Sequence, residues 1–297
     1  MRIVVVGTGG IGGPYGAALA KSGAEVTFVA RGAHLAAIRA NGLRIEGDRG
    51  ETRIRPAQAT DDIGGIGTVD FVLLCVKLWD VESAGARLRS ILGPRTAVVP
   101  LQNGVDAAER LIPILGYDAV MGGTAFVTGT IAAPGVIRQT GTYQRMTFGE
   151  LDGRPSERGQ RLSAQCEAAG FEGILSADIR VPIWEKFILL VPLSGLHALT
   201  RVPLGVWRDD PDLLGLYEAL YAKLSLSASP RECRCRQTLS TTGWRKCGRC
   251  RRTIRPRWET TCSAATGSSC PGLPARSSSS AAATISRRRS TASSMRR

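Results

Sequence analysis

Short apolar segments alternate with polar ones over the first hundred residues, and this pattern predicts a sheet with helical connections. The apolar runs are rich in β-branched residues and lie at residues 2–6, 25–30, 70–80 and 96–104. Such runs are typical of strands buried on both faces of a parallel sheet. An Ala-rich apolar segment ending at Lys21 predicts a helix between the first two strands. We therefore expect an α/β fold built on a doubly wound sheet.

A longer apolar segment, residues 181–200, predicts a helix that opens a second, helical region. Pro192 should kink this helix, because proline lacks a backbone donor and crowds the carbonyl four residues back. Lys186, Leu190 and Ser194 share one face at spacings of four residues. A lysine beside an apolar stripe more often extends its ammonium group to solvent than takes part in catalysis, so both interpretations stay open.

The pattern changes near residue 223, where apolar periodicity ends. Residues 223–297 hold 17 of the 39 Lys and Arg residues, two of the 25 Asp and Glu residues and six of the eight cysteines. We expect this basic, low-complexity tail to be disordered, because it offers no apolar face for a core. The predicted organisation is a dinucleotide-binding domain over residues 1–177, the start of a helical domain over 178–222, and the tail.

Composition also bears on the compartment. The N-terminus lacks the pattern of a signal peptide, and no stretch approaches the roughly 20 apolar residues of a membrane span. Residues 1–222 contain two cysteines, Cys75 and Cys166. We therefore expect a cytoplasmic protein with reduced thiols and no membrane partner.

A glycine motif follows the first predicted strand. It has the pattern G-x-G-x-x-G and consists of Gly7, Thr8, Gly9, Gly10, Ile11 and Gly12. In such a motif the first glycine permits a tight turn, the second lets a pyrophosphate approach the backbone, and the third lets helix and strand pack closely. The helix N-terminus adds N–H donors and positive potential. The context predicts a dinucleotide site, with an ordinary glycine-rich turn as the alternative.

The residue after the second strand favours one cofactor. Enzymes that use NAD usually place Asp or Glu there to bind the ribose hydroxyls, whereas this chain has Arg31. A guanidinium suits a 2′-phosphate, which an acid would repel. The sequence therefore favours NADP, and a solvated arginine at a strand end is the alternative.

Two further polar residues end predicted strands. Lys77 comes directly after the apolar residues of the third run, and Asn103 lies near the end of the fourth. Ligands of doubly wound sheets bind at the carboxyl ends of strands, so we expect both side chains to face the same crevice. Each residue is unspecific by itself, because a terminal lysine is usually solvated and Asn-Gly is usually a turn.

Five motifs occur along the chain in the order GTGGIG, ARGAHLAAIRANGLRI, LLCVKLWD, LQNG and WEKF. Together they resemble the motifs of the ketopantoate reductase (2-dehydropantoate 2-reductase) family. The resemblance covers residues 1 to about 222. It implies a Rossmann domain joined to an all-helical domain. It also implies NADPH-dependent reduction of 2-dehydropantoate to pantoate, on the path to pantothenate and coenzyme A.

The resemblance also assigns roles to residues. The glycines would cradle the pyrophosphate, Arg31 would meet the 2′-phosphate, and Lys77 and Asn103 would line the cofactor crevice. Lys186 would be the catalytic general acid, and Asn103, Lys186 and Ser194 would contact a small 2-oxo acid. No metal is expected, and a homodimer is left open. One form of the family has asparagines where this chain has Leu190 and Ser194, so the substrate beyond a small 2-oxo acid is open.

The tail departs from the family. The peptide DLQRGNRLEL resembles a segment of family members. When codons for this peptide are read one base late, they encode TCSAATGSSC. Residues 261–270 of this chain have the sequence TCSAATGSSC. We therefore interpret the chain as frame-displaced from about residue 223. This interpretation leaves the activity of the protein open, and an inactive remnant of a reductase is one of the alternatives. A second reading of the DNA across codons 215–235 tests this.

The alternative is a nucleotide-binding domain whose tail binds metal through Cys233, Cys235, Cys247 and Cys250, or binds nucleic acid through its arginines. We do not favour an evolved nucleic-acid partner.

Overall fold

The computed structural model describes residues 1–227. The predicted tail therefore lies outside the described residues, apart from its first few positions. Those positions belong to the last turn of helix α8, which spans Pro211–Ser227. The proposed metal-binding cysteines and the frame-displaced segment also lie outside the described residues.

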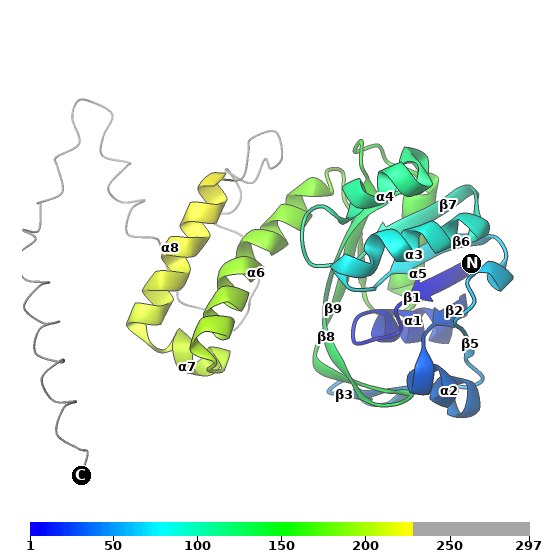
Figure 1. The fold of residues 1–297 in the computed structure, drawn as a ribbon, viewed down its shortest axis with the longest axis horizontal. Helices are drawn as coiled ribbons and strands as arrows, with labels where there is room; N and C mark the ends of the chain where they lie inside the picture. Colours follow the sequence, from blue (N-terminus) through cyan, green and yellow to red (C-terminus); the bar gives the residue numbers. More distant parts are fainter. Residues whose placement is uncertain (228–297) are drawn as a thin grey trace, which may run out of the picture. The chain divides into compact units, whose positions relative to one another are not determined.

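A parallel five-stranded sheet forms the N-terminal part of the protein, as predicted (Figure 1). Its strand order is β5-β2-β1-β6-β7. The strands are β1 (Arg2–Val6), β2 (Glu25–Val29), β5 (Gln58–Thr60), β6 (Val69–Leu74) and β7 (Leu92–Pro100). Alternate residues of β1 enter two different apolar clusters, which confirms that this strand is buried on both faces. The doubly wound α/β prediction is confirmed.

Helices connect these strands and cover the sheet. They are α1 (Gly12–Lys21), α2 (Gly32–Asn41), α3 (Val81–Leu88) and α4 (Ala107–Leu115). Short 3₁₀ turns occur at η1 (Gly64–Ile66), η2 (Leu78–Asp80), η3 (Arg89–Ile91) and η4 (Tyr117–Ala119). Helices α3 and α4 pack against each other and close the apolar cluster on one face of the sheet.

A second sheet, which the sequence patterns did not predict, covers α1. Its strands are β3 (Leu43–Gly47), β4 (Thr52–Ile54), β8 (Met121–Ala133), β9 (Val136–Glu150) and β10 (Glu172–Leu175), and α5 (Glu157–Ala168) precedes β10. The long antiparallel hairpin of β8 and β9 dominates this sheet. Tyr15 of α1 is fully buried, and its hydroxyl donates to the carbonyl of Arg145 at 2.7 Å. Helix α1 thus lies between the two sheets.

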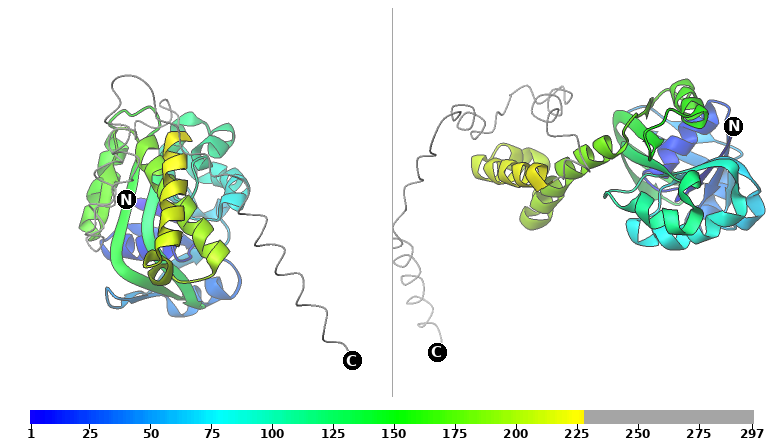
Figure 2. Two further views of the ribbon diagram at one scale, coloured as in Figure 1. Left: turned by 90° about the vertical axis from the view of Figure 1, so that its left-hand side faces the viewer. Right: turned by 90° about the horizontal axis from the view of Figure 1, so that it is seen from above.

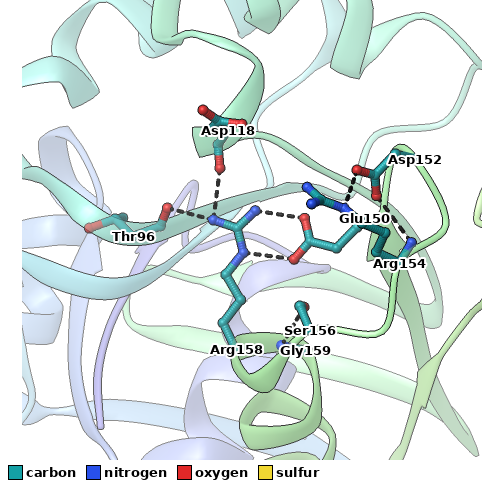
Figure 3. Close-up of polar contacts among 8 residues, drawn as sticks. All are labelled: Thr96, Asp118, Glu150, Asp152, Arg154, Ser156, Arg158 and Gly159. Carbon is teal, nitrogen blue, oxygen red and sulfur yellow. Dashed lines mark hydrogen bonds and ion pairs between the residues drawn. The ribbon is translucent and has the colours of Figure 1, made fainter.

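A partly buried ion pair holds α5 against both sheets (Figure 3). The Arg158 guanidinium donates two parallel hydrogen bonds, of 2.8 and 2.6 Å, to the carboxylate of Glu150. It also donates to the carbonyls of Thr96 and Asp118. Burial raises the pKa of Glu150, but hydrogen bonds from Arg158 and Ser156 and the positive charge of Arg158 outweigh this effect and lower it below its ordinary value.

The second, helical region starts where the sequence predicted it. Helix α6 (Arg180–Thr200) runs through Pro192 without a break, and α7 (Leu204–Arg208) leads into α8. Helix α8 returns alongside α6 (Figure 2). Two small apolar clusters join the helices, one around Ile188 and one around Trp207. The helical region therefore has less core than the sheet domain.

Large apolar side chains remain exposed on these helices. They are Val191, Leu199, Leu204, Val206, Leu216, Leu220 and Leu226. Helix α6 is also long and apolar enough to cross a membrane, by length and composition alone, and 22% of its most apolar window is buried. This finding does not decide the expectation that no stretch approaches a membrane span. It is weak evidence for a span, because the core helix of a soluble protein meets the same criteria.

Candidate active site

The glycine motif forms the turn between β1 and α1 that the sequence predicted. Gly7 has a φ of +96°, and an added Cβ would lie 2.9 Å from the carbonyl carbon of Cys75. A Cβ on Gly12 would lie 2.4 Å from the carbonyl oxygen of Gly7. At Gly9, by contrast, an added Cβ meets no atom within 4 Å. The first and third glycines are therefore required by packing, and the second faces open space beside the start of α1.

The two remaining central positions of the motif face the protein. A Cβ on Gly10 would lie 1.8 Å from the carbonyl oxygen of Gly129 in β8. Ile11 packs against the main apolar cluster. Among the glycines of the motif, Gly9 is therefore the one with open space on its Cβ side, whereas Gly10 packs against the β8–β9 hairpin.

Hydrogen bonds fix the loop to its neighbours. The carbonyl of Val29 at the end of β2 accepts from the backbone N–H of Gly7, the N–H of Thr8 and the Thr8 hydroxyl. His34 of α2 connects the loop to the β8–β9 turn. Its Nδ1 accepts from the N–H of Gly135, so its Nε2 carries the proton and donates to the Thr8 carbonyl at 2.8 Å. The sequence interpretation gave His34 no role, because its partners lie far away in the chain.

Arg31 stands where the sequence placed it, directly after β2 and before α2. Its side chain is exposed. Within residues 1–227 it makes no ion pair or side-chain hydrogen bond. The guanidinium thus remains available for an anionic group beside the glycine loop. Its predicted contact with a 2′-phosphate stays a prediction.

The carboxyl ends of β6 and β7 lie side by side, as predicted for Lys77 and Asn103. Gln102 connects them, because its Nε2 donates to the carbonyls of Leu74 and Val76 at 2.8 and 3.1 Å. Lys77 and Asn103 follow these carbonyls and are both exposed. The Oε1 of Gln102 is buried and has no partner among residues 1–227. Sequence reasoning missed Gln102 as the residue that holds the two strand ends together.

Lys186 of α6 is buried, with 8% of its surface exposed. Its Nζ donates to the carbonyl of Ala125 in β8 and lies 5.2 Å from the centre of the Phe126 ring. Burial lowers its pKa to about 8. Within the part of the chain that the structure describes, no carboxylate pairs with it. The alternative that Lys186 extends its ammonium group into solvent is therefore wrong.

A cavity of about 340 Å³ brings the three predicted substrate residues together. It is lined by Asn103, Gly104, Ile183, Lys186, Phe187, Leu190, Val191 and Ser194. The glycine loop, Arg31 and Lys77 are not among its lining residues, although they follow β1, β2 and β6 at the same carboxyl edge of the parallel sheet. The arrangement places a buried ammonium group beside the strand ends where ligands of such sheets bind.

A second cavity, the two free thiols and possible metal ligands were also considered as sites. A cavity of about 430 Å³ is lined by the Glu150–Arg158 pair and its neighbours, whose groups already bind one another. Burial raises the pKa of the free thiols of Cys75 and Cys166 to about 12, so neither is a reactive thiolate at neutral pH. Among the described residues, no three His, Cys, Asp or Glu side chains form a metal-binding group.

The parallel sheet, the glycine turn and the buried lysine are those of a nicotinamide-dependent oxidoreductase. The model of the family "Ketopantoate reductase PanE/ApbA" matches residues 3–153. The 2-dehydropantoate 2-reductase of Mesorhizobium japonicum is 33% identical over 221 residues, which cover 67% of each chain. The protein belongs to the ketopantoate reductase family.

Solved structures agree with this assignment. The 2-dehydropantoate 2-reductase of Geobacter metallireducens superposes with a TM-score of 0.72 at 28% identity and covers 76% of this chain and 74% of its own. D-mandelate dehydrogenase in complex with NADH gives a TM-score of 0.69 at 18% identity, covering 78% of this chain and 74% of its own. The second likeness concerns the fold alone.

Proposed function

We propose that this protein reduces 2-dehydropantoate to pantoate with NADPH, a step towards pantothenate and coenzyme A. The observation that carries the proposal is the position of Lys186, a buried lysine that lines one cavity together with Asn103 and Gly104, which follow the carboxyl end of β7. Family membership supplies the reaction type. When bound, NADPH supplies the hydride that reaches the carbonyl carbon of the 2-oxo acid.

Lys186 acts as the general acid in this proposal. Negative charge develops on the carbonyl oxygen during reduction, and an ammonium group stabilises it and transfers a proton to that oxygen. With a pKa of about 8, Lys186 is mainly protonated at neutral pH. One of its three N–H donors is held by Ala125, so the other two remain for the substrate. Asn103 and Ser194 supply further hydrogen-bonding groups in the same cavity.

The residues around the glycine turn fit a dinucleotide. Gly9 leaves the backbone open, and the first turn of α1 offers N–H donors and positive potential to a pyrophosphate. Arg31 is exposed and has no ion-pair partner among residues 1–227, so its guanidinium suits the additional phosphate of NADPH. Lys77 offers a second cation at the neighbouring strand end. These features support NADPH over NADH as the cofactor.

Replacing Lys186 tests the assignment. Lys186→Met preserves most of the side-chain volume but removes the proton donor, so kcat for 2-dehydropantoate should fall about 10²- to 10⁴-fold. The wild-type rate should also decline as the pH rises above about 8, because Lys186 then loses its proton. The measurement is NADPH oxidation at 340 nm across a pH series.

The matched control is Lys21→Met, which changes an exposed lysine at the end of α1. It should keep the wild-type rate and pH profile. Fluorescence titration with NADPH should give the same Kd for all three proteins. A Lys186→Met enzyme that retains the wild-type rate would exclude Lys186 as the acid.

A further inference from the structure

We propose that Phe126 of β8 is a positioning residue for Lys186, and that the face of its ring holds the lysine ammonium group in place and in its charged form. The inference rests on the proposed reduction, in which Lys186 is the general acid. It adds the residue that keeps this acid protonated. Phe126 is not among the residues that line the cavity, so it acts on the reaction through the lysine.

The ammonium group of Lys186 lacks the partner that usually stabilises a buried charge. The residue is 8% exposed, and among residues 1–227 no carboxylate pairs with its Nζ. The hydrogen-bond acceptor of Nζ is the carbonyl of Ala125, which is neutral. Burial favours the uncharged amine and lowers the pKa of Lys186 to about 8. A further source of negative potential is therefore important for keeping the proton at neutral pH.

The ring of Phe126 supplies such a potential. The Nζ of Lys186 lies 5.2 Å from the ring centroid, within the roughly 6 Å over which an aromatic face attracts a cation. Ala125 and Phe126 are consecutive residues of β8, so one strand fixes Nζ through two contacts, a hydrogen bond and a ring face. Neither residue lines the cavity that Lys186 lines, so the two contacts do not take up space in it.

Arg145 of β9 fixes the ring in turn. It is the cross-strand neighbour of Phe126 in the β8–β9 hairpin. Its guanidinium carbon lies 4.9 Å from the centroid of the Phe126 ring and 5.3 Å from that of Tyr143. The two rings meet edge to face, with centroids 6.2 Å apart. These contacts restrict the orientation of the ring that faces Lys186.

The charged groups around Lys186 do not replace this contact. Strand β8 has no titratable side chain over Met121–Ala133, and on β9 Arg145 adds positive charge. Glu172 of β10 lies 3.8 Å from the Nε of Arg145 and offsets that charge. The titratable residues of the two helices on the other side are Arg180, Glu185 and His197 on α6 and Asp212, Tyr217, Glu218, Tyr221 and Lys223 on α8. In the described part of the chain, none of their acids forms an ion pair with Lys186.

Replacing the ring tests the proposal through the pH profile. Phe126→Leu keeps an apolar side chain but removes the aromatic face, so Lys186 should lose its proton at lower pH. The alkaline limb of kcat for NADPH-dependent reduction of 2-dehydropantoate should move down by about 0.5–1.5 pH units. 3,4,5-Trifluorophenylalanine at position 126 keeps the shape of the ring but weakens the negative potential of its face. It should move the limb in the same direction, and it retains the packing that leucine loses.

Tyr143→Leu is the matched control. Tyr143 contacts the same ring and the same guanidinium and is 52% exposed. Within residues 1–227, however, Lys186 contacts the ring of Phe126 and not that of Tyr143. The variant should keep the alkaline limb close to its wild-type position, because Arg145 still packs on Phe126. An unchanged limb in both ring variants, or an equal shift in Tyr143→Leu, would overturn the inference.

NMR titration separates this inference from the proposed reaction. The chain has five lysines, so a carbon-13 label at lysine Cε gives few signals, and that of Lys186 is the one missing from Lys186→Met. Its titration midpoint should fall by about 0.5–1.5 pH units in both ring variants and stay unchanged in Tyr143→Leu. If the protein does not reduce 2-dehydropantoate, the proposed function fails, and this titration still tests Phe126. Equal midpoints in the wild type and both ring variants refute its role.

Discussion

The ion pair between Glu150 and Arg158 should contribute strongly to stability. The side chains are only 12% and 19% exposed, and the guanidinium binds both carboxylate oxygens and two backbone carbonyls. Arg158→Met leaves the Glu150 carboxylate partly buried without its cation and removes a donor from the carbonyls of Thr96 and Asp118. Breaking such a pair on one side costs about 3–5 kcal/mol of unfolding free energy.

A neighbouring pair on the same helix provides the control. Arg161 pairs with Asp70 at 3.3 Å, but these side chains are 42% and 32% exposed. Exposed pairs contribute about 0–1 kcal/mol, so Arg161→Met should lower the free energy of unfolding by no more than that. Urea denaturation followed by tryptophan fluorescence measures both variants. Equal losses in the two variants would refute the argument that burial and shared hydrogen bonds make the Glu150 pair stronger.

The pH dependence follows from the lowered pKa of Glu150. Its folded-state pKa lies below the unfolded value of about 4.3, so the pair stabilises the protein above that pH. The contribution disappears as the pH falls through the folded-state pKa. The difference in unfolding free energy between wild type and Arg158→Met should therefore be largest near neutrality and shrink below about pH 4. A difference that is constant from pH 7 to pH 3 would contradict this.

Two further predictions concern the cofactor site. Arg31→Ala should lower kcat/KM for NADPH about tenfold or more and leave that for NADH unchanged, whereas Arg39→Ala, in the helix α2 that follows Arg31 but paired with Asp61, should alter neither. Steady-state kinetics with both cofactors decides this, and an equal loss with NADPH and NADH would argue against a 2′-phosphate contact. Gly9→Ala should weaken NADPH binding at almost unchanged thermal stability, whereas Gly10→Ala should lower the unfolding free energy by about 1–3 kcal/mol, because its Cβ would overlap the Gly129 carbonyl. Thermal unfolding and NADPH titration separate these outcomes.

Features that depend on local sequence could be predicted well. The run of β-branched residues at β1, the glycines after it and the apolar start of α1 define a strand, a turn and a helix within about 20 residues. The same holds for Arg31, Lys77 and Asn103, because strand ends can be located from the end of an apolar run. The helix over residues 180–200 was predicted for the same reason.

Features that depend on distant contacts could not be predicted. The β8–β9 hairpin and its packing on α1 escaped prediction, because no local pattern indicated which elements would cover the helix. The Nδ1 of His34 accepts a hydrogen bond from the N–H of Gly135, which is 101 positions away. The Nε2 of Gln102 donates to carbonyls 26 and 28 positions away. No local sequence pattern marks these two side chains. Their structural role depends on backbone groups that only folding brings close to them.

The sequence alone determined that a turn with three glycines follows β1 and that an arginine follows β2, because these features are set by residues close together in the chain. Only the tertiary structure decided the state of Lys186. Its burial, its bond to Ala125 some 61 positions away and its lowered pKa arise where α6 packs against β8. A lysine at this position is exposed or buried according to what covers it, and the four-residue spacing of Lys186, Leu190 and Ser194 in the sequence is the same in both cases.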